Sequence, residues 1–245
     1  MTAPKPAPVS SRTTWLLAAL AVVAVALTAL LVLRDRDDDS QPQVQPTSNA
    51  AERNPALVVS LAPDGAQQLG LPNAAKVIDV YEDPLCPVCS QFEQMYGARL
   101  DAAVDQGKIA VRYHLLNFLD KASHSKDYST RAIAAFRCVA QTGNGLSYTR
   151  FHNTLFLTSQ PQEEGSSDLS NQQLADLAKK AGAPDAAVKC VADGAQVGPA
   201  RQAADTGLNA LKTAMKGGPA GTPTVMSGDT KIDLDDSNWI LKLIP

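Results

Sequence analysis

The chain has 245 residues, of which 44% are hydrophobic, and a net charge of −3. This length accommodates one sizeable domain with flanking tails. Acidic and basic residues are mixed along the sequence, which excludes the basic, aromatic-rich stretches typical of nucleic-acid binding; the sequence carries no cofactor-binding signature and predicts no cofactor.

The first part of the chain is expected to precede the folded domain. Residues 1–14 are rich in Pro, Ser and Thr and predict a cytoplasmic tail. Residues 15–33 carry no charge; as a helix they would span about 28 Å, close to the hydrocarbon thickness of a bilayer. They predict a transmembrane helix. Residues 34–54 are charged and then rich in Gln, Pro and Ser, the composition of a flexible linker.

A cleaved signal peptide is the alternative to a retained anchor. The basic residues on the two sides of the apolar run are nearly balanced, so charge does not decide the orientation. Both interpretations leave the rest of the chain outside the cytoplasm. The sequence therefore predicts a single-pass protein of the cell membrane whose folded domain lies on the extracytoplasmic side.

Residues 55–245 are expected to form one α/β domain. Strands are predicted at 56–61, 76–81 and 108–118, a turn at 64–73, and a helix at 86–106 that Gly107 ends. Helical patterns separated by Gly and Pro follow at 128–141, 148–158, 171–181, 185–192 and 197–215. Two short strands (224–226, 231–234) and a helix (237–243) close the chain. The pattern indicates a small sheet interrupted by a helical insertion at about residues 120–216.

Two cysteines separated by two residues, Cys86 and Cys89, stand between the strand at 76–81 and the next helix. A thiolate in the first turn of a helix faces unpaired backbone N–H groups and the positive end of the helix dipole, which lower its pKa. Cys89, one turn further on, is close enough to form a disulfide with Cys86. All four cysteines follow the apolar segment, as expected in an oxidising compartment. The pattern indicates dithiol–disulfide exchange.

The chain resembles the thioredoxin superfamily and, within it, the DsbA-like disulfide oxidoreductases. Three features of residues 55–245 carry the resemblance: Cys86-Pro87-Val88-Cys89 between strand and helix, Gly221-Thr222-Pro223-Thr224 at the start of a late strand, and the helical block between them. The resemblance implies a thioredoxin-like fold with an inserted helical domain. It implies that Cys86 attacks and Cys89 resolves, and that Thr222 and a cis Pro223 flank the sulfurs and pair with substrate.

The resemblance also implies a structural disulfide between Cys138 and Cys190, because some actinobacterial-type members have a second bridge. It would close a loop of about fifty residues and contribute roughly 4 kcal/mol on the chain-entropy model. Buried free thiols are the alternative, whereas a second redox centre would require exposure and a perturbed pKa.

One position departs from the family. Many members carry a buried acid six residues before the first cysteine, where this chain has Val80. Strand alternation places Asp79 on the opposite face, which leaves Glu82 as the candidate proton acceptor. No spacing rule brings Glu82 or Asp83 close to Cys89, however, and the pattern favours solvated loop charges or charges at a helix N-terminus.

The remaining candidates predict ordinary structural roles. His114, His124 and His152 are scattered and predict surface or core histidines, since their spacing with the cysteines matches no short metal-binding pattern. No metal site is therefore predicted. The core of the helical block is expected to contain four large residues, Phe136, Phe151, Leu155 and Phe156.

The sequence thus predicts an extracytoplasmic thiol–disulfide oxidoreductase. The proline directly after the first cysteine is the DsbA-like placement, which favours an oxidase. Its partners would be exported proteins with free thiols and a membrane protein that reoxidises the pair by passing electrons to quinone. The alternatives are a reductase or isomerase of the same fold and a non-enzymatic metal-binding or interaction module.

Overall fold

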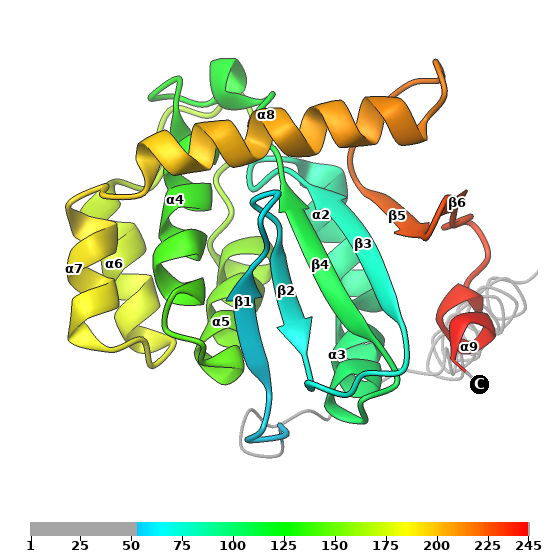
Figure 1. Ribbon diagram of the computed structural model, residues 1–245. Coiled ribbons are helices and arrows are strands. Elements are labelled where there is room, and N and C mark those ends of the chain that lie inside the picture. Colours follow the sequence, from blue (N-terminus) through cyan, green and yellow to red (C-terminus); the bar gives the residue numbers. More distant parts are fainter. Residues whose placement is uncertain (1–52, 245) are drawn as a thin grey trace, which may run out of the picture. The chain divides into compact units, whose positions relative to one another are not determined.

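The computed structural model describes residues 53–244 (Figure 1). The predicted tail (1–14), the predicted transmembrane helix (15–33) and almost all of the predicted linker (34–54) lie outside these residues. Within residues 53–244, no helix combines the length and the apolar character that crossing a membrane requires.

A mixed sheet lies at the centre of the described domain, with strand order β1-β2-β4-β3-β5-β6 (Figure 1). The parallel pair β3–β4 is flanked by antiparallel neighbours. The side chains of β3 are mostly buried, as expected for a central strand. The strands are β1 (Val58–Leu61), β2 (Gln67–Gly70), β3 (Val77–Glu82), β4 (Ala110–Leu115), β5 (Thr224–Ser227) and β6 (Thr230–Lys231).

Strand β2 corrects the sequence prediction, which placed only a turn at 64–73. Gly65 makes a turn with a φ of 89°, but the chain then pairs with both β1 and β4. Gln67 is buried and its side-chain oxygen accepts a 2.8 Å hydrogen bond from the Tyr148 hydroxyl. The segment has no β-branched residues, so its strand character comes from these partners and not from local propensity.

The predicted helix after the cysteines is present but is interrupted by a π turn. It consists of α2 (Pro87–Phe92), the π turn η1 (Glu93–Gly97) and α3 (Ala98–Asp105). Gly107, with a φ of 67°, follows the end of α3, as predicted. π turns inside α-helices frequently mark functional sites, and η1 begins one turn after Cys89.

The predicted helical insertion is present between β4 and β5. Its long helix α8 (Val197–Ala214) runs across the sheet and contacts both α4 and β4 (Figure 1). The closing strand is shorter than predicted, since β6 pairs only at Thr230 and Lys231. The other elements are η2 (Asp120–Ala122), α4 (Tyr128–Ala140), α5 (Gly145–Asn153), η3 (Thr154–Thr158), α6 (Asn171–Lys180), α7 (Asp185–Ala192) and, after the sheet, α9 (Trp239–Leu243).

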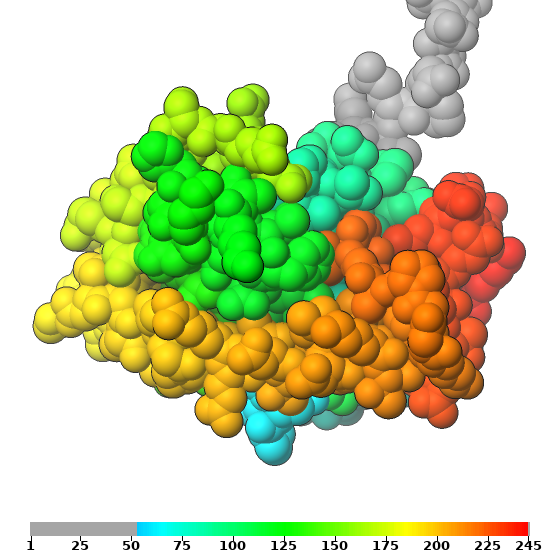
Figure 2. Space-filling view, turned by 90° about the horizontal axis from the view of Figure 1, so that it is seen from above, coloured from blue at the N-terminus to red at the C-terminus, as the bar shows by residue number. Residues whose placement is uncertain are grey.

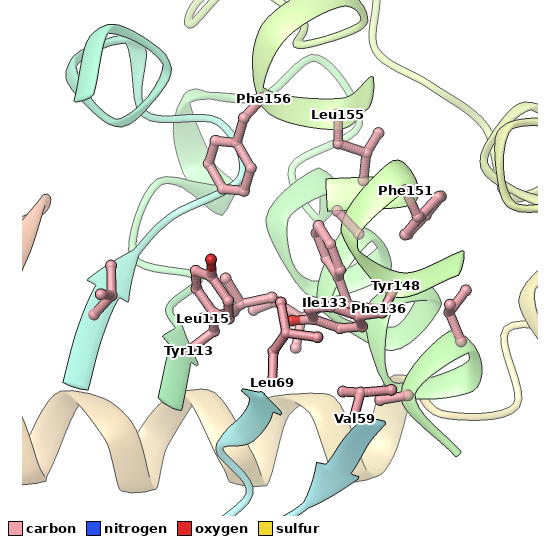
Figure 3. Packing of buried hydrophobic residues seen from close by; sticks show 14 of the residues in the cluster. Val59, Leu69, Tyr113, Leu115, Ile133, Phe136, Tyr148, Phe151, Leu155 and Phe156 are labelled. Carbon is pink, nitrogen blue, oxygen red and sulfur yellow. The ribbon is translucent and has the colours of Figure 1, made fainter. Parts of the chain in front are cut away.

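One core joins the insertion to the sheet. Phe136, Phe151, Leu155 and Phe156 are all buried, as predicted. Figure 3 shows them opposite sheet residues such as Tyr113. Burying a side chain of this size contributes about 1.5–3 kcal/mol. This shared core fixes the position of α5 and η3 relative to β3 and β4.

Candidate active site

The first cysteine of the pair stands at the junction of the β3 loop and α2. Cys86 is the N-cap residue, with an extended backbone, and Pro87 occupies the first helical position, where a missing N–H costs no hydrogen bond. The Cys86 thiol points to the carbonyl oxygen of Thr222, at 3.7 Å. Both Cys86 and Cys89 are free thiols in this structure.

Cys86 is the more acidic thiol. The pKa of Cys86 is lowered to about 6. Hydrogen bonding from the Cys89 thiol is the largest cause, and Thr222 and the backbone N–H groups of Cys89 and Val88 also lower the pKa, against the opposing effect of burial. A thiol with this pKa is largely ionised at neutral pH, and the resulting thiolate is an effective nucleophile and leaving group.

Cys89 is held in the opposite state. It is fully buried, and burial raises its pKa far above the ordinary value. The hydrogen bond to Cys86 and the negative charge of Glu82 raise it further. The pair is therefore asymmetric: one sulfur ionises readily, whereas the other needs a proton whenever it leaves a disulfide.

The segment around Pro223 lies against the cysteines. The Thr222–Pro223 peptide bond is cis, and the Thr222 carbonyl faces Cys86. Viewed from above, the orange segment that leads into β5 lies close to the cyan-green start of α2 (Figure 2). A surface hollow lined by Pro223 and residues 231–235 adjoins this segment. The structure thus brings together four sequence-predicted residues, Cys86, Cys89, Thr222 and Pro223.

Glu82 and Asp83 are not solvated loop charges, and that interpretation of the sequence is wrong. Both are fully buried. Asp83 accepts hydrogen bonds from the backbone N–H groups of Leu85 and Leu119, each at 3.0 Å, and from the Ser129 hydroxyl at 2.5 Å. Burial nevertheless raises the pKa of Asp83 to about 7. Asp83 therefore ties the cysteine loop to the start of the helical insertion.

Glu82 belongs to a second buried cluster. Its Oε2 lies 3.2 Å from Nε2 of His152, and burial raises the pKa of Glu82 to about 8, against a lowering effect of a hydrogen bond with Glu93. One donor atom from each of Glu82, Glu93 and His152 falls within 4.8 Å of the others. The three side chains therefore form a buried cluster of two carboxyl groups and one imidazole.

A glutamine of the insertion also contacts the cysteine loop. Gln160 follows η3 and donates from Nε2 to the carbonyl oxygens of Pro84 and Cys86, at 3.1 Å each. The yellow-green segment that contains it lies beside the start of α2 in Figure 2. Gln160 therefore holds the backbone on both sides of Leu85 in place.

The second cysteine pair lies in the helical insertion. Cys138 on α4 and Cys190 on α7 form a disulfide with a sulfur–sulfur distance of 2.03 Å. Cys138 is buried in the core, and the bond joins two helices through cysteines that are 52 residues apart in sequence.

The other two histidines have ordinary environments. His114 is buried, hydrogen-bonds Asp79 at 2.7 Å and stacks on Tyr81. His124 is exposed. Neither is part of the cysteine site.

Comparisons with known proteins agree with this geometry. The family described as Thioredoxin matches residues 64–244. The chain belongs to this family. Among solved structures, the thiol-disulfide oxidoreductase MdbA from Corynebacterium matruchotii is 30% identical with a TM-score of 0.68, covering 80% of this chain and 96% of that one. DsbA from Mycobacterium tuberculosis in its reduced form is 28% identical with a TM-score of 0.56, covering 78% and 94%.

These structural relatives identify the chain as a DsbA-like thiol–disulfide oxidoreductase of the thioredoxin superfamily. A curated relative, the serine/threonine-protein kinase PknE of Mycobacterium tuberculosis, is 42% identical over 172 residues, which is 70% of this chain. The chain spans only 30% of that kinase, so the kinase as a whole is not a guide to its activity.

Three residues of the site were missed in the sequence. The sequence could have indicated Glu93, because this residue lies four positions after Cys89 and therefore on the same face of the helix. No sequence pattern indicates His152 or Gln160, since each reaches the site from the helical insertion. Only the packing of that insertion against β3 and β4 brings them there.

Proposed function

We propose that this protein forms disulfide bonds in exported proteins through Cys86 and Cys89. The observation that carries the proposal is the asymmetry of the pair, in which the Cys86 thiolate is stabilised and Cys89 is held protonated. An ionised Cys86 exists only in the reduced enzyme. Its stabilisation therefore favours the reduced enzyme over the disulfide, and a disulfide with this property is a strong oxidant.

The reaction has two exchange steps. A substrate thiolate attacks Cys86 Sγ, the Cys86–Cys89 bond breaks, and Cys89 leaves with the electron pair. A second substrate thiolate then attacks the substrate sulfur of the mixed disulfide and releases Cys86 as a thiolate. The substrate loses two electrons to the enzyme pair, as dithiol–disulfide exchange requires.

The leaving Cys89 needs a proton inside the protein. Glu82 is the proposed source, because it is buried, its pKa is raised to about 8, and its charge acts on Cys89. A carboxylic acid with this pKa is mostly protonated at pH 7. In the reverse direction the Glu82 carboxylate accepts the proton of Cys89.

The substrate is expected to lie along the cis-proline segment. The Thr222 carbonyl faces the reactive sulfur, and Pro223 has no backbone N–H. An extended peptide can hydrogen-bond to the backbone at Thr222, with its cysteine directed to Cys86.

Location and partners follow from the same scheme. Residues 15–33 would anchor the protein in the cell membrane with the catalytic domain on the extracytoplasmic side, where oxidised pairs persist. The reduced enzyme must pass two electrons on before the next turnover. A membrane protein that delivers them to quinone is the proposed acceptor.

The test is to measure both the direction and the potential of the reaction with the full chain. A reduced peptide with two cysteines should be oxidised stoichiometrically, and equilibration with a glutathione buffer should give a potential near that of strong oxidants, about −120 mV. A potential near that of thioredoxin, about −270 mV, would assign the protein to the reductases. Capture of Cu(I) or Zn(II) by the reduced pair without thiol oxidation would favour a metal-binding module.

A further inference from the structure

Two carboxyl groups and an imidazole are buried together within electrostatic reach of Cys89. Glu82 comes from β3, Glu93 from η1 and His152 from α5. All three side chains are buried. The charge of Glu82 acts on Cys89 and on Glu93, so the cluster is coupled to the resolving thiol.

One oxygen of each carboxyl group lacks a hydrogen-bond donor. The Oε1 atoms of Glu82 and Glu93 are buried, and neither has a hydrogen-bond partner among the described residues. Two adjacent buried carboxyl groups do not both ionise, because like charges repel strongly where water is excluded. A proton kept on Glu93 supplies a donor to Glu82 and removes the repulsion when Glu82 ionises.

The local structure makes room for this pair. Glu93 opens the π turn η1, and a side chain at Gly97 would begin 2.6 Å from Glu93 Oε2. A glycine at this position therefore lets the Glu93 carboxyl lie against the helix. The π turn η1 thus begins at Glu93 and ends at this glycine.

Aromatic rings enclose the imidazole. The ring centroids of Tyr113, Phe156 and Phe136 lie 4.5, 4.7 and 5.7 Å from that of His152. Figure 3 shows these three side chains lining the core between the sheet and the insertion. A surrounding of this kind strengthens each hydrogen bond within it and penalises unpaired charge.

The other titratable groups facing the cluster are few. Burial raises the pKa values of Tyr113 and Tyr148 well above the ordinary value, so both side chains stay neutral. Asp101 forms an ion pair with Arg53 at 2.8 Å. The groups that face the cluster from the elements packed against it are Cys86 (the N-cap of α2), Cys89 (α2), Asp101 (α3), Tyr113 (β4) and Tyr148 (α5).

We propose that Glu93 and His152 are positioning residues that hydrogen-bond the Glu82 carboxyl group, so that the three side chains act as one proton store for Cys89. The proposal rests on the proposed function, because the store serves the thiol that leaves during exchange. Glu93 donates a hydrogen bond to the Glu82 carboxylate, and His152 holds its second oxygen.

The proton balance is simple. When Cys89 leaves the disulfide, the O–H bond of Glu82 breaks and an S–H bond forms at Cys89. The new Glu82 carboxylate accepts hydrogen bonds from protonated Glu93 and from His152. On reoxidation the proton returns from Cys89 to Glu82, and electrons move only between sulfur atoms.

The test compares variants that keep a donor with variants that remove it. Glu93→Gln and His152→Gln retain an N–H donor, whereas Glu93→Leu and His152→Phe remove it. The full chain is oxidised, and the rate of its reduction by a cysteine peptide, divided by the thiolate fraction of the peptide, is recorded against pH. Asp205→Asn, at an exposed position of α8, is the matched control, and circular dichroism establishes that each variant is folded.

We expect Glu93→Leu and His152→Phe to move the midpoint of the pH profile upward by about one unit, a tenfold change in proton affinity. The two Gln variants and Asp205→Asn should keep the midpoint close to that of the wild type. An unchanged midpoint in Glu93→Leu and His152→Phe, or equal shifts in the Gln and apolar variants, would overturn the proposal. So would stoichiometric Zn²⁺ binding by the wild type that Glu93→Gln abolishes.

Infrared titration separates this inference from the proposed function. The C=O band of a buried protonated carboxyl group is measured on the wild type, Glu82→Gln and Glu93→Leu without any substrate. A band whose titration shifts in both variants supports the proton store even if the protein oxidises no peptide. A band unaffected by either substitution refutes it, while the peptide assay independently tests the oxidase activity.

Discussion

The two cysteine pairs of this chain differ in their bonding state and in their surroundings. Cys86 and Cys89 are two residues apart in sequence and free, while Cys138 and Cys190 are 52 residues apart and bonded. The first pair combines a helix start, the Thr222 carbonyl and a buried carboxyl cluster. The second joins α4 and α7, with Cys138 buried in the hydrophobic core. We therefore expect redox activity from the first pair because of its surroundings, and not merely because two thiols are present.

The largest difference between the two pairs is expected when their sulfur atoms are replaced. Cys86→Ser should abolish turnover, because no other sulfur can form the mixed disulfide, whereas Cys89→Ser should accumulate mixed disulfides with peptide. Cys138→Ser/Cys190→Ser should keep most of the turnover in the same peptide-oxidation assay. Loss of turnover in the double variant without loss of stability would identify the second pair as an electron relay.

Thiol titration tests whether Cys86 ionises more readily than Cys89. The rate of alkylation of Cys86 should rise with pH and level off with a midpoint near 6, because the Cys89 thiol, Thr222 and nearby backbone N–H groups stabilise its thiolate. Cys89 is fully buried and should remain unmodified in the folded protein. Mass spectrometry after a brief alkylation at each pH gives both values. A midpoint near that of free cysteine, about 8.5, would contradict the asymmetry.

The stability of the second pair is the next test. Cys138→Ser/Cys190→Ser should lower the free energy of unfolding by about 2–5 kcal/mol, the usual effect of losing a native disulfide. Reversible urea unfolding of the wild type and the variant measures this difference. Reduction of Cys86–Cys89 alone should not produce a loss of this kind, since it closes only a very short loop.

A smaller, pH-dependent effect is expected at Glu82. Its folded pKa of about 8 lies above the ordinary value of 4.5, so the folded state holds a proton that the unfolded state has lost. Stability therefore falls as pH rises from about 4.5 to 8. Glu82→Gln should increase the free energy of unfolding by a few kcal/mol at pH 9 and by much less at pH 5. Equal effects at both pH values would argue against a buried, protonated Glu82.

Much of the fold could be predicted from local pattern. The strand before Cys86, the helix after it and the five helical segments of the insertion all lie where the sequence indicates. Strand β2 could not be predicted, because Gln67–Gly70 lacks strand-forming residues and becomes a strand only between β1 and β4. Residues that depend on neighbours distant in sequence carry little local signal.

In the site, too, some features depend on the local sequence and others on residues distant in sequence. By itself the sequence determined that two thiols stand at a helix start and that a Thr-Pro step opens a late strand, since both depend on neighbours along the chain. Only the tertiary structure decided that Glu82 and Asp83 are buried, and that His152 and Gln160 reach the cysteine loop. The physical reason is that burial and proton affinity are set by every group that excludes water from a side chain. Here those groups come from the helical insertion, about seventy residues away in sequence.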